Sequence, residues 1–374
     1  MQFINHGFRL ACTGSILLAA PSLSMAEVAA PAKTSEISYV FDGGRNFGGG
    51  IKKGAFSAGS AHLSINVDSE GAGLWSGGTL HLETLIDHGV NPSAQYIGDL
   101  QTASNIADQG RTRMHQAWFE QKFGDFSLLV GRHDMNSEFY VSEYAALFTN
   151  SSFGIGPEIT ANVPVSIFPV AGAAARIAYQ SDPLALRFAG YDGDPSTTSI
   201  ADREGKFWIG EAEANIGNGR YKVGGWRHSL WAPPQKKRMG INISGTYGGY
   251  LLIDQPIASS ETREVGLFLQ LGMAQKDKVD ISRYVGVGLH AKGVIPGRSD
   301  DEAGIAMAQA LFSNRYLANT PGSKKGETAY ETTYKIQLND MLSIQPSFQY
   351  IANPSGDPTI KNARVGILRI GITL

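Results

Sequence analysis

The chain has 374 residues, a net charge of −2 and only 18% charged residues. This near-neutral balance does not indicate a phosphate-backbone partner, so nucleic acid is not an expected ligand. Its 45 glycines and 16 prolines are many for a packed globular domain but too few for a low-complexity chain.

Residues 1–26 have the pattern of an export signal. Arg9 precedes an apolar run, and the small residues Ser24 and Ala26 occupy the two positions that a signal peptidase reads. We therefore expect cleavage after Ala26, with a buried N-terminal helix as the alternative interpretation. The one cysteine, Cys12, lies within this segment, so the exported chain needs no disulfide framework.

Beyond the signal, short segments alternate apolar residues with polar or small ones and are separated by Gly, Asn, Asp and Pro, which predicts strands. None of these segments is an apolar run long enough for a transmembrane helix. We expect residues 27–60 to lead into one β-domain at 61–374. The clearest strand patterns, in chain order, are 61–70, 78–89, 111–123, 125–134, 175–194 (a pair of strands), 263–275, 280–292, 328–340 and 363–374.

The connections between these segments are of two kinds. Gly124-Asp125, Asp182-Pro183 and Asn339-Asp340 predict tight hairpin turns, because turn residues close the chain locally. Short turns alternating with long connections are typical of an outer-membrane β-barrel, and a β-sandwich is the alternative. The long connections are 89–110, 134–170 and 191–206.

The last segment shows which face meets which environment. Leu368, Ile370 and Ile372 alternate with Arg369 and Gly371, so one face is lipid-like and the other is small or polar. An arginine facing lipid at mid-depth costs about 2–4 kcal/mol, so Arg369 is expected in the lumen or near an interface. Aromatic residues near strand ends predict an interfacial girdle. Its expected members are Tyr140, Tyr144, Trp226, Trp231, Tyr247 and Tyr250.

Six stretches, in this order, carry motifs of a known family. They are NPSAQYIGDLQTASNIAD (91–108), AWFEQKFGDFSLLVGRHDMNSEF (117–139), FTNSSFGIGPEITANVPVSIFPVAG (148–172), YLLIDQPI (250–257), YVGVGLHAKGVIPGRSDDEAGIAMA (284–308) and YETTYKIQLNDMLSIQPSFQYIANPSG (330–356). On these residues the chain resembles the carbohydrate-selective porins of the OprB type. The final residue departs from that pattern, because such barrels commonly end in an aromatic residue and this chain ends in Leu374, which bears on assembly efficiency.

The resemblance implies an all-β fold, a transmembrane antiparallel β-barrel of about 16 strands with long extracellular loops, one of them folded inward. It implies passive, carbohydrate-selective diffusion across the outer membrane of a Gram-negative bacterium. The implied partners are monosaccharides, small oligosaccharides and outer-membrane lipid, and both a monomer and a homotrimer fit such a barrel. The alternatives are a porin for polyols or hydroxy acids, and a glycan-binding β-sandwich without a channel.

The sequence lacks the common catalytic motifs, such as Gly-x-Ser-x-Gly, His-Glu-x-x-His and the P-loop, so no enzyme, cofactor or metal site is expected. Alternation together with the resemblance gives the candidate pore-lining residues, and a structural ion pair in the wall is the alternative role for each. They are Arg111, Arg113, Glu120, Arg132, Asp134, Asn136, Glu138, Glu143, Arg176, Arg187, Glu211 and Arg227.

The weakly charged stretch at 150–164 is expected to fold inward and support the constriction. Inside a barrel, a loop needs Ser and Asn side chains to satisfy its own backbone, and glycines permit close approach. The residues expected to do this are Asn150, Ser151, Ser152 and Gly154. The acidic stretch at 294–302 is expected to be an extracellular loop of solvated charge rather than a cation site.

Overall fold

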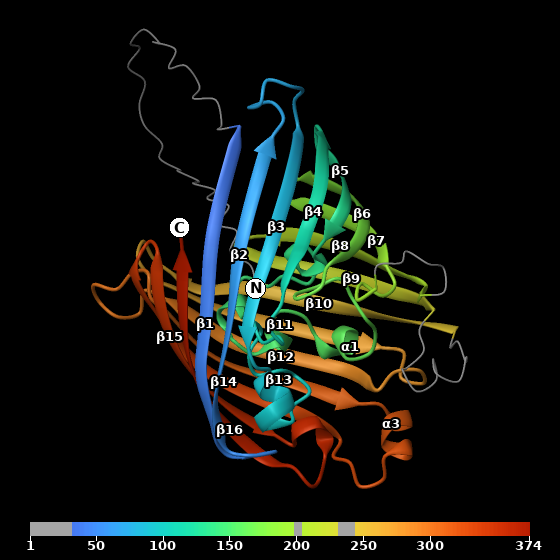
Figure 1. Ribbon diagram of the computed structural model, residues 1–374, viewed down its shortest axis with the longest axis vertical. Helices are drawn as coiled ribbons and strands as arrows, with labels where there is room; N and C mark the ends of the chain where they lie inside the picture. Colours follow the sequence, from blue (N-terminus) through green and yellow to red (C-terminus); the bar gives the residue numbers. More distant parts are fainter. Residues whose placement is uncertain (1–31, 198–203, 231–243) are drawn as a thin grey trace.

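The computed structural model describes residues 32–197, 204–230 and 244–374 (Figure 1). In these ranges sixteen strands form one closed antiparallel barrel, in which each strand pairs with its neighbours along the chain and β1 pairs with β16. The strands are β1 (Lys33–Gly50), β2 (Gly54–Asp68), β3 (Gly78–Gly89), β4 (Thr112–Phe123), β5 (Phe126–His133), β6 (Gly172–Ser181), β7 (Leu184–Asp192), β8 (Lys206–Ile216), β9 (Gly219–Leu230), β10 (Ser244–Ser259), β11 (Glu264–Ala274), β12 (Ile281–Lys292), β13 (Glu302–Phe312), β14 (Gly326–Asn339), β15 (Leu342–Ala352) and β16 (Lys361–Thr373). No helix among the described residues is long and apolar enough to cross a membrane.

The barrel confirms the predicted fold class and corrects one boundary. β1 and β2 are full members of the sheet, so the barrel begins at Lys33 rather than at residue 61. The expected signal segment, 1–26, lies outside the described residues. β1 was missed because its glycine-rich second half, with glycines at 43, 44 and 48–50, weakens the apolar alternation that identifies a strand.

The two ends of the barrel differ. At one end, here called the short-turn end, β1 begins, β16 ends, and tight turns occupy 124–125, 182–183, 217–218 and 340–341. At the other, here called the long-loop end, the connections include 90–111, 134–171 and 313–325. The short helices lie in these long connections: η1 (Ser93–Ile97), η2 (Met135–Ser137), η3 (Ala145–Leu147), η4 (Ser151–Phe153), α1 (Pro157–Thr160), α3 (Asn314–Asn319) and η6 (Pro354–Gly356).

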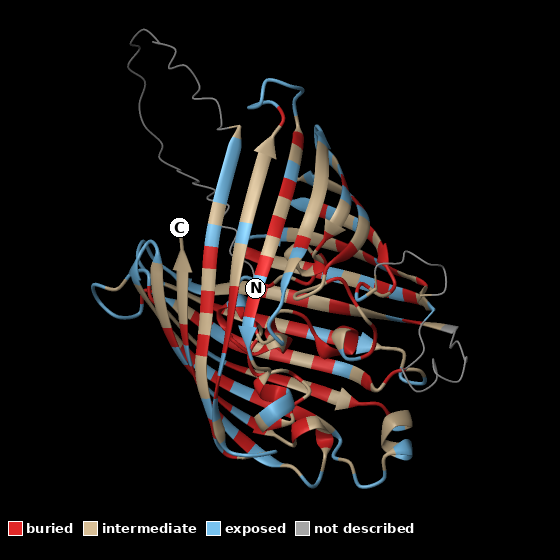
Figure 2. Cartoon of the chain, in the orientation of Figure 1, coloured by how far each residue is buried: buried red, intermediate tan, exposed pale blue. Residues whose placement is uncertain are grey.

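Alternation places large apolar side chains on the outer face. On β7, Leu184, Leu186 and Phe188 are exposed, whereas Ala185 and Ala189 on the opposite face are buried. The buried bands along the strands and the buried segments enclosed by them are visible in Figure 2. The core of this protein therefore lies inside the barrel, between the wall and the segments that fold into it.

The expected aromatic girdle is largely wrong. Tyr140 and Tyr144 belong to a loop inside the barrel, and Trp226 and Tyr250 are buried on inner faces. Of the expected members that the structure describes, Tyr247 alone is exposed on the outer face; Trp231 lies outside the described residues. Aromatic residues near strand ends were the signal used, but the face of the strand decides their environment.

Candidate functional site

The connection between β5 and β6, residues 134–171, lies inside the barrel and is anchored by a buried carboxylate. Glu331 on β14 accepts hydrogen bonds from the backbone N–H and the hydroxyl of Thr149, both at 2.8 Å, and from the N–H of Asn150 at 3.0 Å. The hydroxyl of Ser347 on β15 donates to the same carboxylate at 2.8 Å. The carboxylate thus satisfies loop N–H groups that have no strand partner.

Two more wall carboxylates hold the same loop against β8 and β10. Glu211 accepts hydrogen bonds from the backbone N–H of Tyr140 at 2.9 Å and from the hydroxyl of Tyr250 at 2.8 Å. Asp254 accepts from the backbone N–H of Glu143 at 2.9 Å. Glu211, a candidate pore-lining residue, is therefore on the inner face but buried, where it anchors the loop.

A second connection, residues 90–111, also folds into the barrel, although the sequence predicted one inward loop. Glu327 on β14 accepts hydrogen bonds from the backbone N–H groups of Leu100 at 2.7 Å and Gln101 at 2.9 Å. The backbone N–H of Asn105 donates to the carbonyl of Thr149 at 2.8 Å, so the two inward loops contact each other.

Arg369 links the 90–111 loop to the junction between β1 and β16. Its guanidinium donates to Asp42 on β1 at 2.7 Å and to the side-chain oxygen of Asn105 at 2.8 Å, and the hydroxyl of Ser104 donates to Asp42 at 2.7 Å. Arg369 is thus on the inner face, as expected, in a buried ion pair across the β1–β16 junction.

The loop-support residues act mainly through the backbone and one amide. The side-chain amide of Asn150 donates to Gln349 at 3.2 Å, and its oxygen caps η4 by accepting from the N–H of Ser152 at 3.1 Å. The carbonyl of Ser152 accepts from the hydroxyl of Tyr284 at 2.7 Å. These contacts fix the loop against β12 and β15.

The neighbouring positions close the loop on itself. The backbone N–H of Ser151 donates to the carbonyl of Thr102 at 2.9 Å, which links the two inward loops a second time. The carbonyl of Gly154 accepts from the side-chain amide of Asn136 at 3.1 Å. Asn136, a candidate pore-lining residue, therefore braces the loop from within.

The inner face of β2–β9 carries charged side chains that remain partly exposed. Arg176 on β6 contacts Glu138 through two nitrogens, at 2.8 and 2.6 Å, and Glu120 on β4 at 2.8 Å. The side chains of Glu138 and Glu120 are 23% and 15% exposed, whereas Arg176 is 3% exposed. The two carboxylates therefore reach the lumen and the arginine fixes their positions from behind.

A second charged cluster lies nearer the short-turn end. Arg187 on β7 contacts Glu213 on β8 at 2.8 Å, and Lys222 on β9 lies 3.5 Å from the same carboxylate. Arg220 on β9 pairs with Glu143 of the inward loop, whose side chain is 61% exposed. Glu143 is thus the most exposed group of this cluster, and the Arg220 side chain beside it is 34% exposed.

A third cluster joins the wall to both inward loops. Arg113 on β4 pairs with Asp108 of the 90–111 loop, lies 3.7 Å from Asp87 on β3, and donates to the carbonyl of Pro169 in the 134–171 loop at 3.4 Å. The side chains of Arg113 and Asp108 are 16% and 19% exposed. Arg111 is exposed just before β4 and has no carboxylate partner among the described residues.

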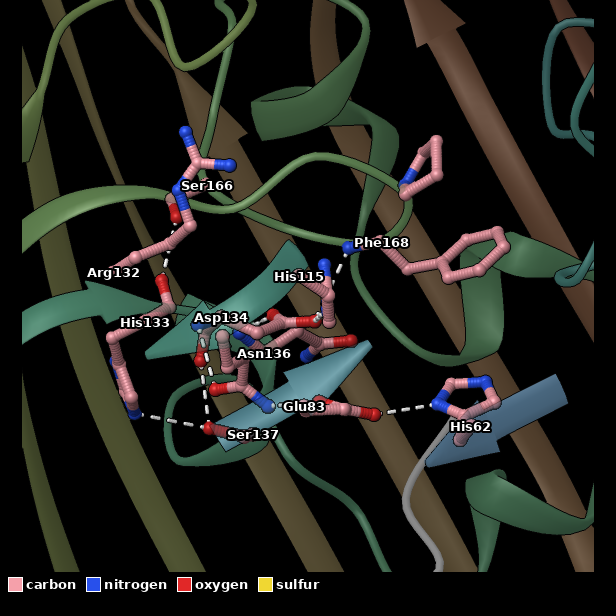
Figure 3. A network of polar contacts seen from close by, with 12 residues as sticks. His62, Glu83, His115, Arg132, His133, Asp134, Asn136, Ser137, Ser166 and Phe168 are labelled. Carbon is pink, nitrogen blue, oxygen red and sulfur yellow. Dashed lines mark hydrogen bonds and ion pairs between the residues drawn. The ribbon is translucent and has the colours of Figure 1, made fainter. Parts of the chain in front are cut away.

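A polar network continues from this cluster across β2, β3 and β4 (Figure 3). A ring nitrogen of His62 lies 2.6 Å from Glu83, and a ring nitrogen of His115 lies 3.1 Å from Asp134. The ring of Phe168 stacks on that of His62 at 6.4 Å between centroids. Burial alone would raise the pKa of Asp134, but the hydrogen bond and charge of His115 hold that pKa below its usual value.

Arg132 and Arg227 do not face the lumen, which corrects their assignment as pore-lining residues. Arg132 shares the outer face of β5 with the exposed Leu128 and Val130 and donates to the carbonyl of Met114 at 3.1 Å. Arg227 is exposed between the buried residues 226 and 228 of β9. The assignment of Arg132 rested on its place after the Glu-Gln strand, and that of Arg227 on an alternation that fits either face, because a one-residue shift reverses the face.

The comparisons with known proteins agree with this architecture. A family model described as carbohydrate-selective porin, OprB family, matches residues 52–374. The chain belongs to this family. Porin B of Pseudomonas aeruginosa is 22% identical over 395 aligned residues, which cover 90% of this chain and 86% of that protein.

Among solved structures, OprB of Pseudomonas putida at high pH has a TM-score of 0.81 and 20% identity, over 92% of this chain and 94% of that one. Its low-pH structure has a TM-score of 0.61 and 18% identity, over 92% and 93%. The DcaP channel of Acinetobacter baumannii has a TM-score of 0.59 and 8% identity, over 91% and 97%. These likenesses show the shared barrel fold.

This OprB-family member is an outer-membrane porin of a Gram-negative bacterium, and it provides carbohydrate-selective passive diffusion for sugars. It is a channel. In such barrels the short turns face the periplasm and the long loops face outward. The acidic stretch at 294–302 joins β12 to β13 at the short-turn end, so it is periplasmic rather than extracellular. There Asp301 is bound by Arg298 at 2.5 Å and by Tyr334 at 2.6 Å.

Proposed function

We propose that sugars pass along the inner faces of β2–β9 and that the constriction lies at Arg113, Asp108 and Phe168. The observation that carries this proposal is that both inward loops meet a partly exposed wall side chain at Arg113, whereas Gln349, which also contacts both loops, is buried. Asp108 of the 90–111 loop and Pro169 of the 134–171 loop both contact Arg113 on β4. Elsewhere the loops pack through buried hydrogen bonds against the inner faces of β10–β12 and β14–β16, and against Glu211 in the middle of β8, so they fill that part of the barrel.

The chemistry of these groups suits a neutral, polyhydroxylated solute. Sugar hydroxyls both donate and accept, so an arginine and a carboxylate side by side can replace their bonds to water. The face of Phe168 offers an apolar surface for the C–H face of a pyranose. Each charge is already neutralised by a partner, so a sugar meets balanced charge and weak binding, as a conducting site requires.

Liposome swelling with a panel of solutes tests this proposal. Replacing Arg113 by Gln or Phe168 by Ala should reduce the preference for sugars over amino acids of the same size by several-fold. Arg132→Gln is the matched control, because this arginine lies on β5 but faces outward. If a variant of Arg113 or Phe168 kept the wild-type preference for sugars, that residue would have a structural role only and no part in selectivity.

The second candidate function is passage of other small polar solutes, such as polyols and hydroxy acids, through the same lumen. The pair of Arg220 and Glu143 favours it, because the two side chains are 34% and 61% exposed and a guanidinium also binds the carboxylate of a hydroxy acid. Equal swelling rates for hexoses and hydroxy acids would support this wider range. The homotrimer stays a prediction, which chemical cross-linking in outer-membrane fractions would test.

A further inference from the structure

The arginines of the barrel strands fall into two groups that differ in their partners. Each described strand arginine on an inner face pairs with a carboxylate; these are Arg113, Arg176, Arg187, Arg220 and Arg369. Five others lie on outer faces and have no acidic partner among the described residues; these are Arg45, Arg132, Arg227, Arg283 and Arg364. Outward charge without a partner calls for a separate explanation.

The outward group, here called the arginine belt, lies at one level of the barrel. Each member is within five residues of the strand end that meets the long loops. Among the described strands, the outer faces of the short-turn halves carry no arginine. An arginine on the lipid face costs about 2–4 kcal/mol at the midplane but about 0–1 kcal/mol near the interface. The positions of the belt therefore match the head-group region of the outer leaflet.

No carboxylate neutralises the belt from its own strands. β5, β9, β12 and β16 contain no Asp or Glu, and the two acidic residues of β1, Glu36 and Asp42, lie on the inner face. The belt is thus a local excess of positive charge on a protein whose net charge is −2.

Aromatic neighbours support the same depth. Arg227 lies in register between Trp208 on β8 and Tyr247 on β10, whose exposed fractions are 42% and 58%. Arg364 lies opposite the exposed Tyr350 on β15. Tryptophan and tyrosine on an outer face favour the membrane–water interface, where one end of the ring is apolar and the other is hydrated.

We propose that the arginine belt binds the phosphate groups of lipid heads that carry a net negative charge, in the leaflet at the long-loop end. A guanidinium offers paired N–H donors that match two phosphate oxygens, and it holds its charge at every physiological pH. The adjacent strands β1 and β16 bring Arg45 and Arg364 together, with the exposed Lys361 at the start of β16. The wall from β9 to β12 carries Arg227 and Arg283.

The test compares the full-length protein in phosphatidylcholine vesicles with and without phosphatidylglycerol. The midpoint of its heat-modifiable gel mobility should rise with phosphatidylglycerol, and added salt should reverse the rise. Replacing the belt arginines by Gln should lower the preference for phosphatidylglycerol about fivefold per arginine. Inorganic phosphate added to phosphatidylcholine vesicles should have no effect, because free phosphate lacks the lipid anchor.

Arg263→Gln is the matched control, since this arginine is exposed and unpaired among the described residues but lies in the β10–β11 turn at the short-turn end. Sugar flux should stay unchanged in all belt variants. If the variant with all five belt arginines replaced does not fold, two double variants test the belt in parts. One replaces Arg45 and Arg364 on β1 and β16, and the other replaces Arg227 and Arg283 on β9 and β12. A wild type without preference for phosphatidylglycerol, or an equal loss in Arg263→Gln, would overturn the proposal.

Discussion

Glu158, on α1 of the 134–171 loop, has a carboxyl group with few neighbouring groups that would stabilise its negative charge. Its side chain is fully buried, its Oε1 accepts one hydrogen bond from the hydroxyl of Tyr140 at 3.1 Å, and its Oε2 has no hydrogen-bond partner among the described residues. Gly272 on β11 makes room for it, because a Cβ there would lie 2.1 Å from the carboxyl carbon. Burial raises the pKa of Glu158 to about 8.

This raised pKa predicts a pH-dependent stability. An unperturbed Glu has a pKa of 4.5 and Glu158 in the fold about 8, so its stabilising effect is complete below pH 4.5 and is lost as the pH rises through 8. Between about pH 5 and pH 9 the midpoint of heat modification should fall, and Glu158→Gln should flatten that dependence. Parallel curves for the two proteins would assign the pH effect to other groups.

At the residue scale, the sequence predicted which side chains lie on the inner face better than it predicted what each of them contacts there. Alternation placed Arg176, Arg187 and Arg369 on inner faces, because strand side chains change face at every residue. It failed at Arg227, where a one-residue shift changes the face. His62 and Glu83 were not selected, although both alternate with apolar neighbours; their meeting depends on the register of β2 and β3, which no local pattern encodes.

The two inward loops lie inside the barrel, and we propose that they make the channel selective. Low charge and small residues predicted that the 134–171 loop folds inward, but the inward folding of the 90–111 loop was not predicted. Its anchor, Glu327, lies more than two hundred residues along the chain from Leu100, whose backbone it binds. Such a contact exists only once the barrel has closed, so the local sequence of 90–111 carries no sign of it.

Glu331 gives the sharpest test of this anchoring. Replacing Glu331 by Ala leaves two loop N–H groups without their acceptor, and each lost hydrogen bond to a charged group costs about 1.5–3 kcal/mol. The loop should loosen, so liposome swelling with larger oligosaccharides should become faster and less selective. The measurement compares swelling rates for sugars of increasing length.

Asp301→Asn is the control for that variant. Asp301 also accepts several hydrogen bonds, from Arg298, Tyr334 and Gln337, but it lies in the β12–β13 turn, away from both loops. Its replacement should lower stability without changing the size limit. If Glu331→Ala kept the wild-type size limit, the loop would be held by its remaining contacts.

At the scale of the whole molecule, closure depends on one junction between the first and last strands. β1 and β16 pair over a long register, from Ser38 opposite Thr373 to Gly50 opposite Lys361. The period-two pattern predicted the barrel class and most of the strands. It could not predict closure by β1, because that pairing joins opposite ends of the chain and β1 is glycine-rich.

A disulfide between β1 and β16 should stabilise the closed barrel against thermal unfolding. Facing Cα atoms in antiparallel strands lie about 4.5–5.5 Å apart, within the range that a disulfide spans. With Ser38 and Thr373 both replaced by Cys, oxidation should raise the temperature of heat modification, and reduction should restore the wild-type value. Each single cysteine variant is the control. Failure of the pair to cross-link in folded protein would contradict the register of β1 and β16.

The anchoring of both inward loops on β14 and β15 has a consequence for how this channel can change. Inner-face residues of β10–β16 such as Glu327, Glu331 and Gln349 hold the loops, so substitutions there would be selected against through loss of folding. Partly exposed charged side chains such as Glu120, Arg187 and Glu213, on β4, β7 and β8, accept or donate no hydrogen bond to the loop backbone among the described residues, so they can vary at a smaller cost. A population selected for growth on an unfamiliar sugar should therefore accumulate its permissive mutations along one arc of the barrel and leave the opposite arc unchanged.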